Sequence, residues 1–310
     1  MNKTIEQAFE QEKYLLMEGA LGERLKREYH LLEDEQVAWA KLVYTEAGRA
    51  ALQEIWGQYM EIASQYKLPF LATTPTRRAN KERVGAVGGD SSIITENVKF
   101  LRNLQRKSSI EMYVGGLMGC KGDAYTGEGS LTRQEAAAFH SWQANAFLEA
   151  EVDFLYAGIM PDLYESIGMA EAMAATGLPY IISFTIQKDG RLMDGTMISK
   201  AIDMIDHMVE RKPLCYMTNC VHPLIVQEAL SQPFNRNEEV RQRFLGIQAN
   251  TSLLTYEELD HAKEIKSEEP ELFAEEMLQL IKERNFKIIG GCCGTDQRHI
   301  AAIAEKLKNN

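Results

Sequence analysis

Short apolar segments recur along this chain of 310 residues, and longer amphipathic segments separate them. Several of the short segments are rich in β-branched or aromatic residues, which is typical of parallel strands buried on both faces. The predicted strands are Tyr14–Met17, Pro69–Thr73, Glu111–Gly115, Val152–Ala157, Tyr180–Ile186, Leu214–Asn219, Phe244–Ala249 and Lys287–Gly290. This alternation limits the fold to one built on a mostly parallel sheet.

Helical patterns fill the intervals between these strands. Thr132, followed by Glu135, is a capping box that opens an alanine-rich helix. The predicted helices are Thr132–Glu151, Pro161–Thr176, Ser199–Arg211, Glu271–Arg284 and Gln297–Lys308. Glu257–Glu269 is a charged stretch that we interpret as a solvated excursion without a chemical role.

Eight strands alternating with helices predict a single-domain (β/α)8 TIM barrel over residues 1–310. An open doubly wound sheet is the alternative. No GxGxxG motif follows the first strand, which disfavours a dinucleotide-binding version of that sheet. The 45% hydrophobic content is sufficient for one large core.

The overall charge and the first residues exclude several classes of protein. A net charge of -11 would repel a phosphate backbone, so we expect no nucleic-acid partner. No apolar run is long enough to cross a bilayer, and Met1–Lys13 lacks the basic-then-apolar order of a signal peptide. We therefore expect a cytoplasmic enzyme that acts on small molecules, and the sequence leaves open whether it forms a homo-oligomer.

Five cysteines stand at positions 120, 215, 220, 292 and 293. An odd number without an export signal argues against a disulfide framework, and adjacent cysteines rarely pair with each other. Cys215 lies inside its strand, where a small buried apolar residue is the simpler interpretation. Cys120 ends the third strand and is a weaker candidate for lining a pocket. We therefore expect reduced thiols.

Three of these thiols are predicted to meet. Cys220 follows the sixth strand, and Cys292 and Cys293 follow the eighth. The carboxyl ends of barrel strands converge on one face, where active sites lie. Three thiolates suit zinc and leave a fourth coordination position open, as catalytic sites do. Spacing alone leaves a metal site and a redox or structural group of thiols equally open.

The residues around these cysteines support a tight site. Gly290, Gly291 and Gly294 permit the sharp bend that two successive ligands require. His222 is a weak candidate for a fourth ligand, because Pro223 beside it indicates a turn.

The sequence resembles the zinc-dependent homocysteine S-methyltransferases over nearly its whole length. The most specific match is Gly290-Gly291-Cys292-Cys293-Gly294-Thr295, and Asn219-Cys220 with Pro223 is similar to the family's sixth-strand motif. Leu16-Met17-Glu18-Gly19-Ala20-Leu21-Gly22-Glu23 resembles the opening motif, and Thr73-Thr74-Pro75-Thr76 the second-strand threonine run. Ser183-Phe184-Thr185, followed by Asp194-Gly195, is similar to the fifth-strand region.

This resemblance implies a zinc ion (Zn2+) held by Cys220, Cys292 and Cys293, which would be the catalytic ligands. It implies substrate-binding roles for Glu18, Gly19, Ala20, Thr74 and Asn219. Glu18, Thr73, Thr74 and Thr76 also have plain structural interpretations, as a helix-terminal carboxylate and as turn residues. The acceptor thiol would bind zinc as a thiolate and attack the methyl group of an onium donor. With homocysteine as acceptor, the product is methionine, a step of methionine biosynthesis.

Two positions depart from the family pattern. Glu18 stands where an aspartate is usual. In the fourth strand, Ala157 stands where a glutamate commonly helps to hold the amino group of homocysteine. We expect that Glu18 acts alone, that Asp162 or Glu165 substitutes, or that the acceptor has no ammonium group.

The donor is expected to be a sulfonium, either S-methylmethionine or S-adenosylmethionine. The chain ends soon after its eighth helix, whereas relatives that use folate or cobalamin carry further domains and betaine-type relatives a C-terminal extension. Tyr125, Phe184 and Tyr216 are aromatic candidates for holding a cation. Two rival functions remain: a zinc- and thiol-binding paralogue with another acceptor or no catalysis, and a redox enzyme that uses Cys292 and Cys293.

Overall fold

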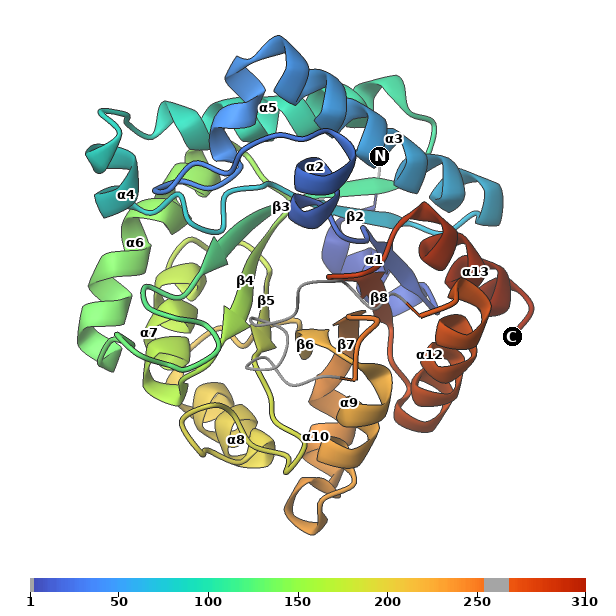
Figure 1. Cartoon of the computed structure of the whole chain (residues 1–310). Helices are drawn as coiled ribbons and strands as arrows, with labels where there is room; N and C mark the ends of the chain where they lie inside the picture. The colour runs from blue at the N-terminus through green and yellow to red at the C-terminus, as the bar shows by residue number, and fades with distance from the viewer. Residues whose placement is uncertain (1–2, 254–267) are drawn as a thin grey trace.

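The computed structural model describes residues 3–253 and 268–310, and its strands close into one barrel in chain order (Figure 1). Every neighbouring pair of strands is parallel, including the closing pair of the first strand with the last. The strands are β1 (Leu15–Met17), β2 (Phe70–Thr73), β3 (Met112–Gly119), β4 (Phe154–Met160), β5 (Tyr180–Phe184), β6 (Cys215–Val221), β7 (Phe244–Ala249) and β8 (Ile288–Gly291).

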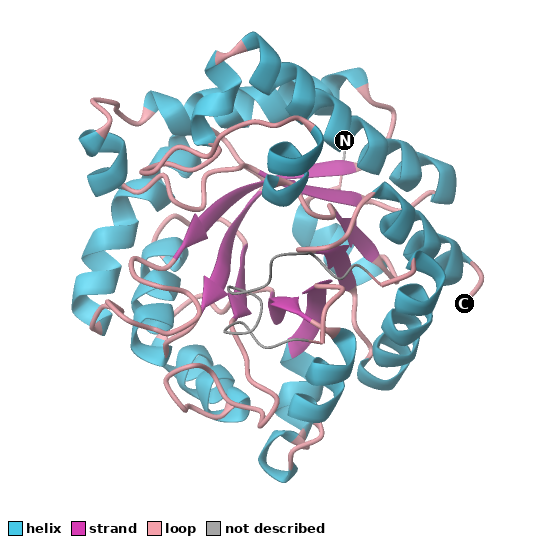
Figure 2. Ribbon diagram, in the orientation of Figure 1, coloured by secondary structure: helices cyan, strands magenta, loops and turns pink. Residues whose placement is uncertain are grey.

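Helices surround the strands on all sides (Figure 2). They are α1 (Ile5–Gln11), α2 (Gly22–Glu28), α3 (Glu46–Tyr66), α4 (Lys81–Ala86), α5 (Ser92–Lys107), α6 (Arg133–Glu149), α7 (Leu163–Ala174), α8 (Ile198–Met208), α9 (Pro223–Leu230), α10 (Glu238–Arg243), α12 (Pro270–Arg284) and α13 (Gln297–Lys308), with 3-10 helices η1 (Ala40–Tyr44) and η2 (Pro233–Asn235). No described helix is both long and apolar enough to cross a membrane. The predicted single-domain (β/α)8 barrel is confirmed.

The alternation of side chains along each strand divides the buried residues into two cores. Outward-facing residues such as Leu155 and Ala157 belong to the large core between the strands and the helices. Inward-facing residues such as Phe154 and Tyr156 belong to a smaller core inside the barrel. Helix α1 contributes Ile5 and Ala8 to that inner core and so covers the amino end of the barrel. Active sites of such barrels lie at the opposite, carboxyl end of the strands.

The predicted elements match the observed ones closely at their centres and less well at their ends. The capping box of α6 is present, with the Glu135 amide bonded to Thr132 Oγ1 at 3.4 Å. β3 and β4 run on to Gly119 and Met160, past the predicted ends. Cys220 accordingly lies inside β6 and not after it. Most of the predicted excursion 257–269 lies outside the described residues.

Candidate metal centre

The three predicted zinc ligands meet at the carboxyl end of the barrel. The sulfur atoms of Cys220, Cys292 and Cys293 all lie within 4.8 Å of one another. Cys220 is buried, Cys292 is half-buried and Cys293 is exposed at the rim. Because the residues come from β6 and from the turn after β8, the closure of the barrel alone brings them together.

The backbone is unusual at Cys220 and at Gly294, the residue that follows Cys293. Cys220 has a left-handed φ of 59°, and the register of β6 against β7 shifts between Asn219 and Val221. Such a bulge turns a side chain that would otherwise follow the strand alternation. After β8, Gly294 has a φ of 81°, and a Cβ there would lie 1.9 Å from Thr251 Oγ1. The predicted need for glycine holds at this position for both reasons.

Backbone hydrogen bonds fix the turn that carries Cys292 and Cys293. The amide of Cys292 donates to the carbonyl of Ala249 at 2.6 Å, and the amide of Thr251 donates to the carbonyl of Cys293 at 3.2 Å. The Thr295 amide closes the turn on the Cys292 carbonyl at 3.1 Å. The end of β7 and the turn after β8 therefore hold each other in place.

The structure joins Cys220 and Cys292 by a disulfide, whereas the sequence led us to expect reduced thiols. The expectation rested on the absence of a disulfide framework, and this bond is not part of one, because it links two residues of a single site. Converging strand ends bring the two sulfurs close enough to bond. The disulfide and a metal are alternative uses of the same sulfurs, so reduction must precede metal binding.

Cys293 remains a free thiol. The residue as a whole is exposed, but its sulfur lies beside the other two cysteine sulfurs, where desolvation raises the pKa of Cys293 to about 11 and the charge of Glu23 adds to this effect. Such a thiol is protonated at neutral pH without a metal. A bound cation reverses that preference, because coordination deprotonates a thiol.

Glu18 is a buried carboxylate beside this site. Its Oε1 accepts hydrogen bonds from the Thr73 hydroxyl at 2.5 Å and the Thr73 amide at 3.1 Å. Its Oε2 is buried and has no partner among the described residues. Burial raises the pKa of Glu18 to about 7, although the bonds from Thr73 oppose this shift. An unpaired buried carboxylate oxygen is a natural acceptor for a cationic group.

The backbone that follows Glu18 is tied to the turn after β8. The amide of Ala20 donates to Thr295 Oγ1 at 3.0 Å, and the carbonyl of Ala20 accepts from Tyr59 at 2.9 Å. Gly19 lies against Tyr59, whose hydroxyl would be 2.7 Å from a Cβ at this position. The backbone of Ala20 is therefore committed to structural bonds, and Gly19 packs against Tyr59.

Thr74 is fully buried, and its hydroxyl already has two partners. It lies 2.7 Å from the Thr76 hydroxyl and accepts from the Leu117 amide at 3.1 Å. These bonds link β2 to β3. A substrate-binding role for Thr74 stays a prediction, and its neighbour Thr73 is the one that contacts Glu18.

Asn219 joins three strands at the mouth. Its Oδ1 accepts from the Ile159 amide at 3.1 Å and from the Ser183 hydroxyl at 2.5 Å. Its Nδ2 lies 3.8 Å from the Cys220 sulfur, to which it donates. The predicted substrate-binding role of Asn219 stays a prediction, and the structure gives this residue a position-setting role next to a candidate ligand.

The sequence placed the missing carboxylate of the fourth strand at position 157, and this position is wrong. Ala157 faces the helices, in the outer core. Because Phe154 and Tyr156 face inward, the next inward position is Gly158. A Cβ on Gly158 would lie 2.9 Å from Leu117 Cδ1. The conclusion that β4 presents no acid is unchanged, and its residue is corrected.

Neither proposed substitute for that acid is available. Asp162 caps the start of α7, where its carboxylate accepts from the Glu165 amide at 2.9 Å. Glu165 is fully buried and accepts from the amides of Lys121 at 2.7 Å and Leu131 at 3.2 Å, with His140 at 3.0 Å. Both acids therefore hold the fold around β4, which leaves Glu18.

Two of the three aromatic candidates lie away from the mouth. Phe184 and Tyr216 stack on each other, with ring centroids 5.4 Å apart, inside the outer core. Tyr125 does lie beside the cysteines, next to the small cluster of Ala124, Ile159 and Cys220. The alternation of β5 and β6 explains the error, since these two rings occupy outward-facing positions.

His222 is not a ligand of this centre. It caps α9, where its Nδ1 accepts from the Leu224 amide at 3.3 Å. Its Nε2 faces Glu268 at 3.3 Å and Glu276 at 3.4 Å, in a group separate from the cysteines. A ring that accepts at Nδ1 carries its proton on Nε2, so it has no lone pair to offer a metal there.

Two residues at the mouth were not singled out in the sequence. Ile159 has a left-handed φ of 58°, which no sequence pattern indicates for a β-branched residue. Arg77 follows the threonine run and lies against Gly119 at the end of β3. Its neighbour Arg78 makes a basic pair, and that pair in a strongly acidic chain was the available signal.

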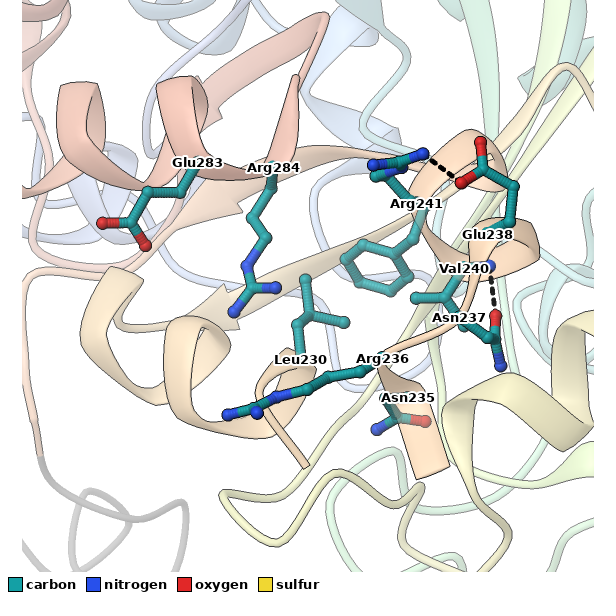
Figure 3. A pocket seen from close by; sticks show the side chains of 10 residues that line it. Leu230, Asn235, Arg236, Asn237, Glu238, Val240, Arg241, Glu283 and Arg284 are labelled. Atoms are coloured by element: carbon teal, nitrogen blue, oxygen red, sulfur yellow. Dashed lines mark hydrogen bonds and ion pairs between the residues drawn. The ribbon is translucent and has the colours of Figure 1, made fainter. Parts of the chain in front are cut away.

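A pocket of about 290 Å³ lies at the other end of the barrel (Figure 3). It opens beside Phe244, the first residue of β7, and charged side chains border it. Arg241 pairs with Glu238, and Arg284 donates to the Gln227 carbonyl at 3.1 Å. No predicted site residue lines this pocket, and barrel enzymes react at the opposite face.

Comparison with known proteins agrees with this architecture. The chain matches the family model described as homocysteine S-methyltransferase over residues 15–307. Crystal structures of the homocysteine methyltransferase MmuM from Escherichia coli share the fold. The metallated form has a TM-score of 0.75 at 19% identity and covers 96% of this chain and 97% of that chain.

Two further forms of the same Escherichia coli protein are similar. The oxidized form has a TM-score of 0.75 at 20% identity, covering 98% of this chain and 100% of that chain. The apo form has a TM-score of 0.67 at 19% identity, covering 96% and 97%.

The fold and the converging thiols define a barrel enzyme with a candidate metal centre at its mouth. The family match spans nearly the whole barrel, so the chain belongs to the homocysteine S-methyltransferase family. It is a methyltransferase of that family.

Proposed function

We propose that this enzyme is a zinc-dependent S-methyltransferase that moves a methyl group from a sulfonium donor to homocysteine, which gives methionine. The observation that carries the proposal is the convergence of three cysteine sulfurs within 4.8 Å at the carboxyl end of the barrel. Membership of the homocysteine S-methyltransferase family supports the acceptor. The metallated form of the Escherichia coli relative supports a metal in this fold.

The residues present fit a zinc ion. Cys220, Cys292 and Cys293 supply soft sulfur ligands, and the described part of the chain adds no fourth residue to their group. When bound there, zinc would deprotonate an acceptor thiol and keep its sulfur nucleophilic at neutral pH. In the transfer, the acceptor sulfur bonds to the methyl carbon while the bond from that carbon to the donor sulfur breaks.

Glu18 would hold the acceptor in place. Its unpartnered Oε2 can accept from the ammonium group of homocysteine, while Thr73 keeps Oε1 fixed. Burial penalises the charge of Glu18, and a bound ammonium would relieve that penalty. With Gly158 in β4 and with Asp162 and Glu165 committed elsewhere, a single carboxylate would serve this purpose.

A sulfonium donor suits the charge of the mouth. Three cysteine thiolates and the acceptor thiolate outweigh the two positive charges of zinc, so the loaded centre is negative. A cationic methyl donor is attracted to such a centre, and both products of its reaction are neutral at sulfur. Tyr125 beside the cysteines offers a ring to the cation.

The test is zinc content and methyl transfer measured on one reduced sample, with homocysteine and either S-methylmethionine or S-adenosylmethionine. We expect about one zinc per chain and methionine formation. Cys292→Ser should lose both, because it removes one of three ligands. Cys215→Ala is the matched control: this cysteine lies in the inner core and should keep both zinc and transfer.

The other outcomes separate the rival functions. Zinc without transfer to any thiol would favour a binding protein without catalysis. Transfer that persists after zinc removal would contradict the metal-dependent mechanism. Loss of activity on alkylation of a metal-free enzyme that was active beforehand would favour redox chemistry at the cysteines.

A further inference from the structure

A basic segment follows β2 at the mouth of this acidic protein. Residues 77–83 include Arg77, Arg78, Lys81 and Arg83 with a single acid, Glu82, in a chain whose net charge is -11. The segment covers the end of the connection from β2 to α4 and the first turn of α4 (Figure 1). Because that connection leaves the carboxyl end of β2, it starts on the face of the barrel where the cysteines lie.

Arg77 is the member of this segment that reaches the candidate centre. Its side chain lies against Gly119, the last residue of β3, where a Cβ would be 2.6 Å from Arg77 Cγ and 3.1 Å from the Arg77 carbonyl oxygen. The next residue, Cys120, borders the cluster that contains Cys220 and Ile159. A glycine at position 119 thus leaves room for the arginine to extend along the rim.

The positive charge of Arg77 changes the pKa values of neighbouring groups at the mouth. Burial raises the pKa values of Cys120 and Tyr125 to about 12. The positive charge of Arg77 opposes both rises and contributes to the lowered pKa of Asp123. These groups lie in the connection between β3 and α6, so the charge of Arg77 lies beside that connection.

Arg77 is half-buried. Within residues 3–253 and 268–310, it makes no ion pair and donates no hydrogen bond. Asp123 is near enough for the charge of Arg77 to lower its pKa, but no described ion pair joins the two, and Arg78 and Arg83 add further positive charge nearby. A half-buried arginine whose donors have no partner in the described part of the chain is suited to bind an anion with two oxygen atoms.

We propose that Arg77 binds the carboxylate group of one of the two substrates at the mouth of the barrel. The inference rests on the proposed function and adds a specificity residue to it. Glu18 on β1 and Arg77 after β2 would then meet opposite charges of amino-acid substrates. The carboxylate can belong to the acceptor or to the donor, since homocysteine and S-methylmethionine both carry one.

The experiment compares each substrate with its counterpart that lacks the carboxylate. The acceptors are homocysteine and 3-aminopropane-1-thiol, and the donors are S-methylmethionine and dimethyl(3-aminopropyl)sulfonium. Steady-state constants and calorimetric binding are measured on the zinc-loaded wild type, Arg77→Gln and Arg77→Lys. Lys81→Gln removes the same charge from an exposed position in the same segment and is the control.

We expect Arg77→Gln to raise KM and the dissociation constant about ten- to a hundredfold for one carboxylate-bearing substrate. The substrate affected identifies the source of the carboxylate. Its counterpart without a carboxylate should bind wild type and variant equally. Arg77→Lys should recover part of the loss, and Lys81→Gln should stay near wild type.

Unchanged constants for Arg77→Gln would overturn the inference. An equal loss with and without the carboxylate would also overturn it, because that pattern indicates a structural role. If the wild type transfers no methyl group, the proposed function fails, and calorimetry with the four compounds still decides the role of Arg77. No difference in binding between each pair of compounds would then count against it.

Discussion

β4 and β6 end at the mouth with the same backbone irregularity and with different chemistry. In each, the register against the next strand shifts, and a non-glycine residue takes a left-handed φ, 58° at Ile159 and 59° at Cys220. Asn219 links them, accepting from the Ile159 amide and donating to the Cys220 sulfur. The two residues then pack in one small cluster with Ala124.

The difference between the two strands shows that the direction of a side chain and its chemistry are set separately. A residue held at positive φ costs on the order of 1–3 kcal/mol, so two such residues at one site are retained by the structure around them. The bulge directs the side chain into the mouth of the barrel. The residue type decides what it does there, a sulfur on β6 and an apolar wall on β4.

The same substitution at both positions is the strongest test of this comparison. Cys220→Gly and Ile159→Gly both release the strained φ, and only the first removes a sulfur. Cys220→Gly should lose zinc and reduce methyl transfer by more than about a hundredfold, since removal of a mere outer partner of a metal ligand already costs about 10- to 100-fold. Ile159→Gly should keep about one zinc per chain. Zinc is measured by metal analysis and transfer by methionine formation.

The two variants also have a contradicting outcome. Equal loss of zinc in both would mean that the shape of the mouth, and not the sulfur of Cys220, holds the metal. Retention of zinc in both would remove Cys220 from the ligand set.

The sequence predicted the cysteine on β6 and not the bulge on β4. Cysteines at two strand ends, with glycines beside the pair, indicated both the barrel face and the metal chemistry. The bulge that carries Ile159 had no such signal, because a β-branched residue is a poor predictor of left-handed backbone. The strand centres were predictable from apolar runs, whereas the last residues of β3 and β4 were not, since glycines there weaken the apolar pattern.

Side-chain direction was the second limit. Ala157 was assigned to the mouth from the family resemblance, and Phe184 and Tyr216 were proposed there as aromatic partners of a cation. All three face the helices. A shift of one residue reverses the face of a strand side chain. Residue-level assignments near a strand end therefore need the register, which the sequence alone did not supply.

Because β4 presents no acid, the proposed binding of the acceptor's ammonium group depends on Glu18, next to β1. Burial raises the pKa of Glu18 from 4.5 to about 7, so the folded protein holds a proton that the unfolded chain releases between these values. The stabilisation is complete below about pH 4.5 and is lost as pH rises through about 7. The loss amounts to about 3 kcal/mol for a shift of this size.

Urea unfolding of the substrate-free enzyme at pH 5 and pH 8 checks this value against Glu18→Gln. The wild type should lose up to about 3 kcal/mol more stability than the variant between the two pH values, because glutamine does not titrate. Other titrating groups are common to both proteins and cancel. Parallel pH dependences would show that Glu18 is ionised in the folded protein without a substrate.

Asn219→Ala tests the link between the two bulges and should have the smallest effect of the three. It removes the acceptor of the buried Ile159 amide and of the Ser183 hydroxyl, together with the donor to Cys220. An unsatisfied buried amide costs about 1–3 kcal/mol. Loss of a partner next to a metal ligand should weaken zinc binding about tenfold, measured by competition with a chelator.

Ser183→Ala is the matched control for Asn219→Ala, because it removes one of the bonds to Asn219 Oδ1 and leaves the contacts to β4 and to Cys220. It should lower stability by about 1 kcal/mol and leave zinc affinity unchanged. If both variants bind zinc as the wild type does, the two bulges form independently. If Ser183→Ala weakens zinc as much as Asn219→Ala, then the orientation of the Asn219 amide, and not its bond to Cys220 alone, sets the ligand position.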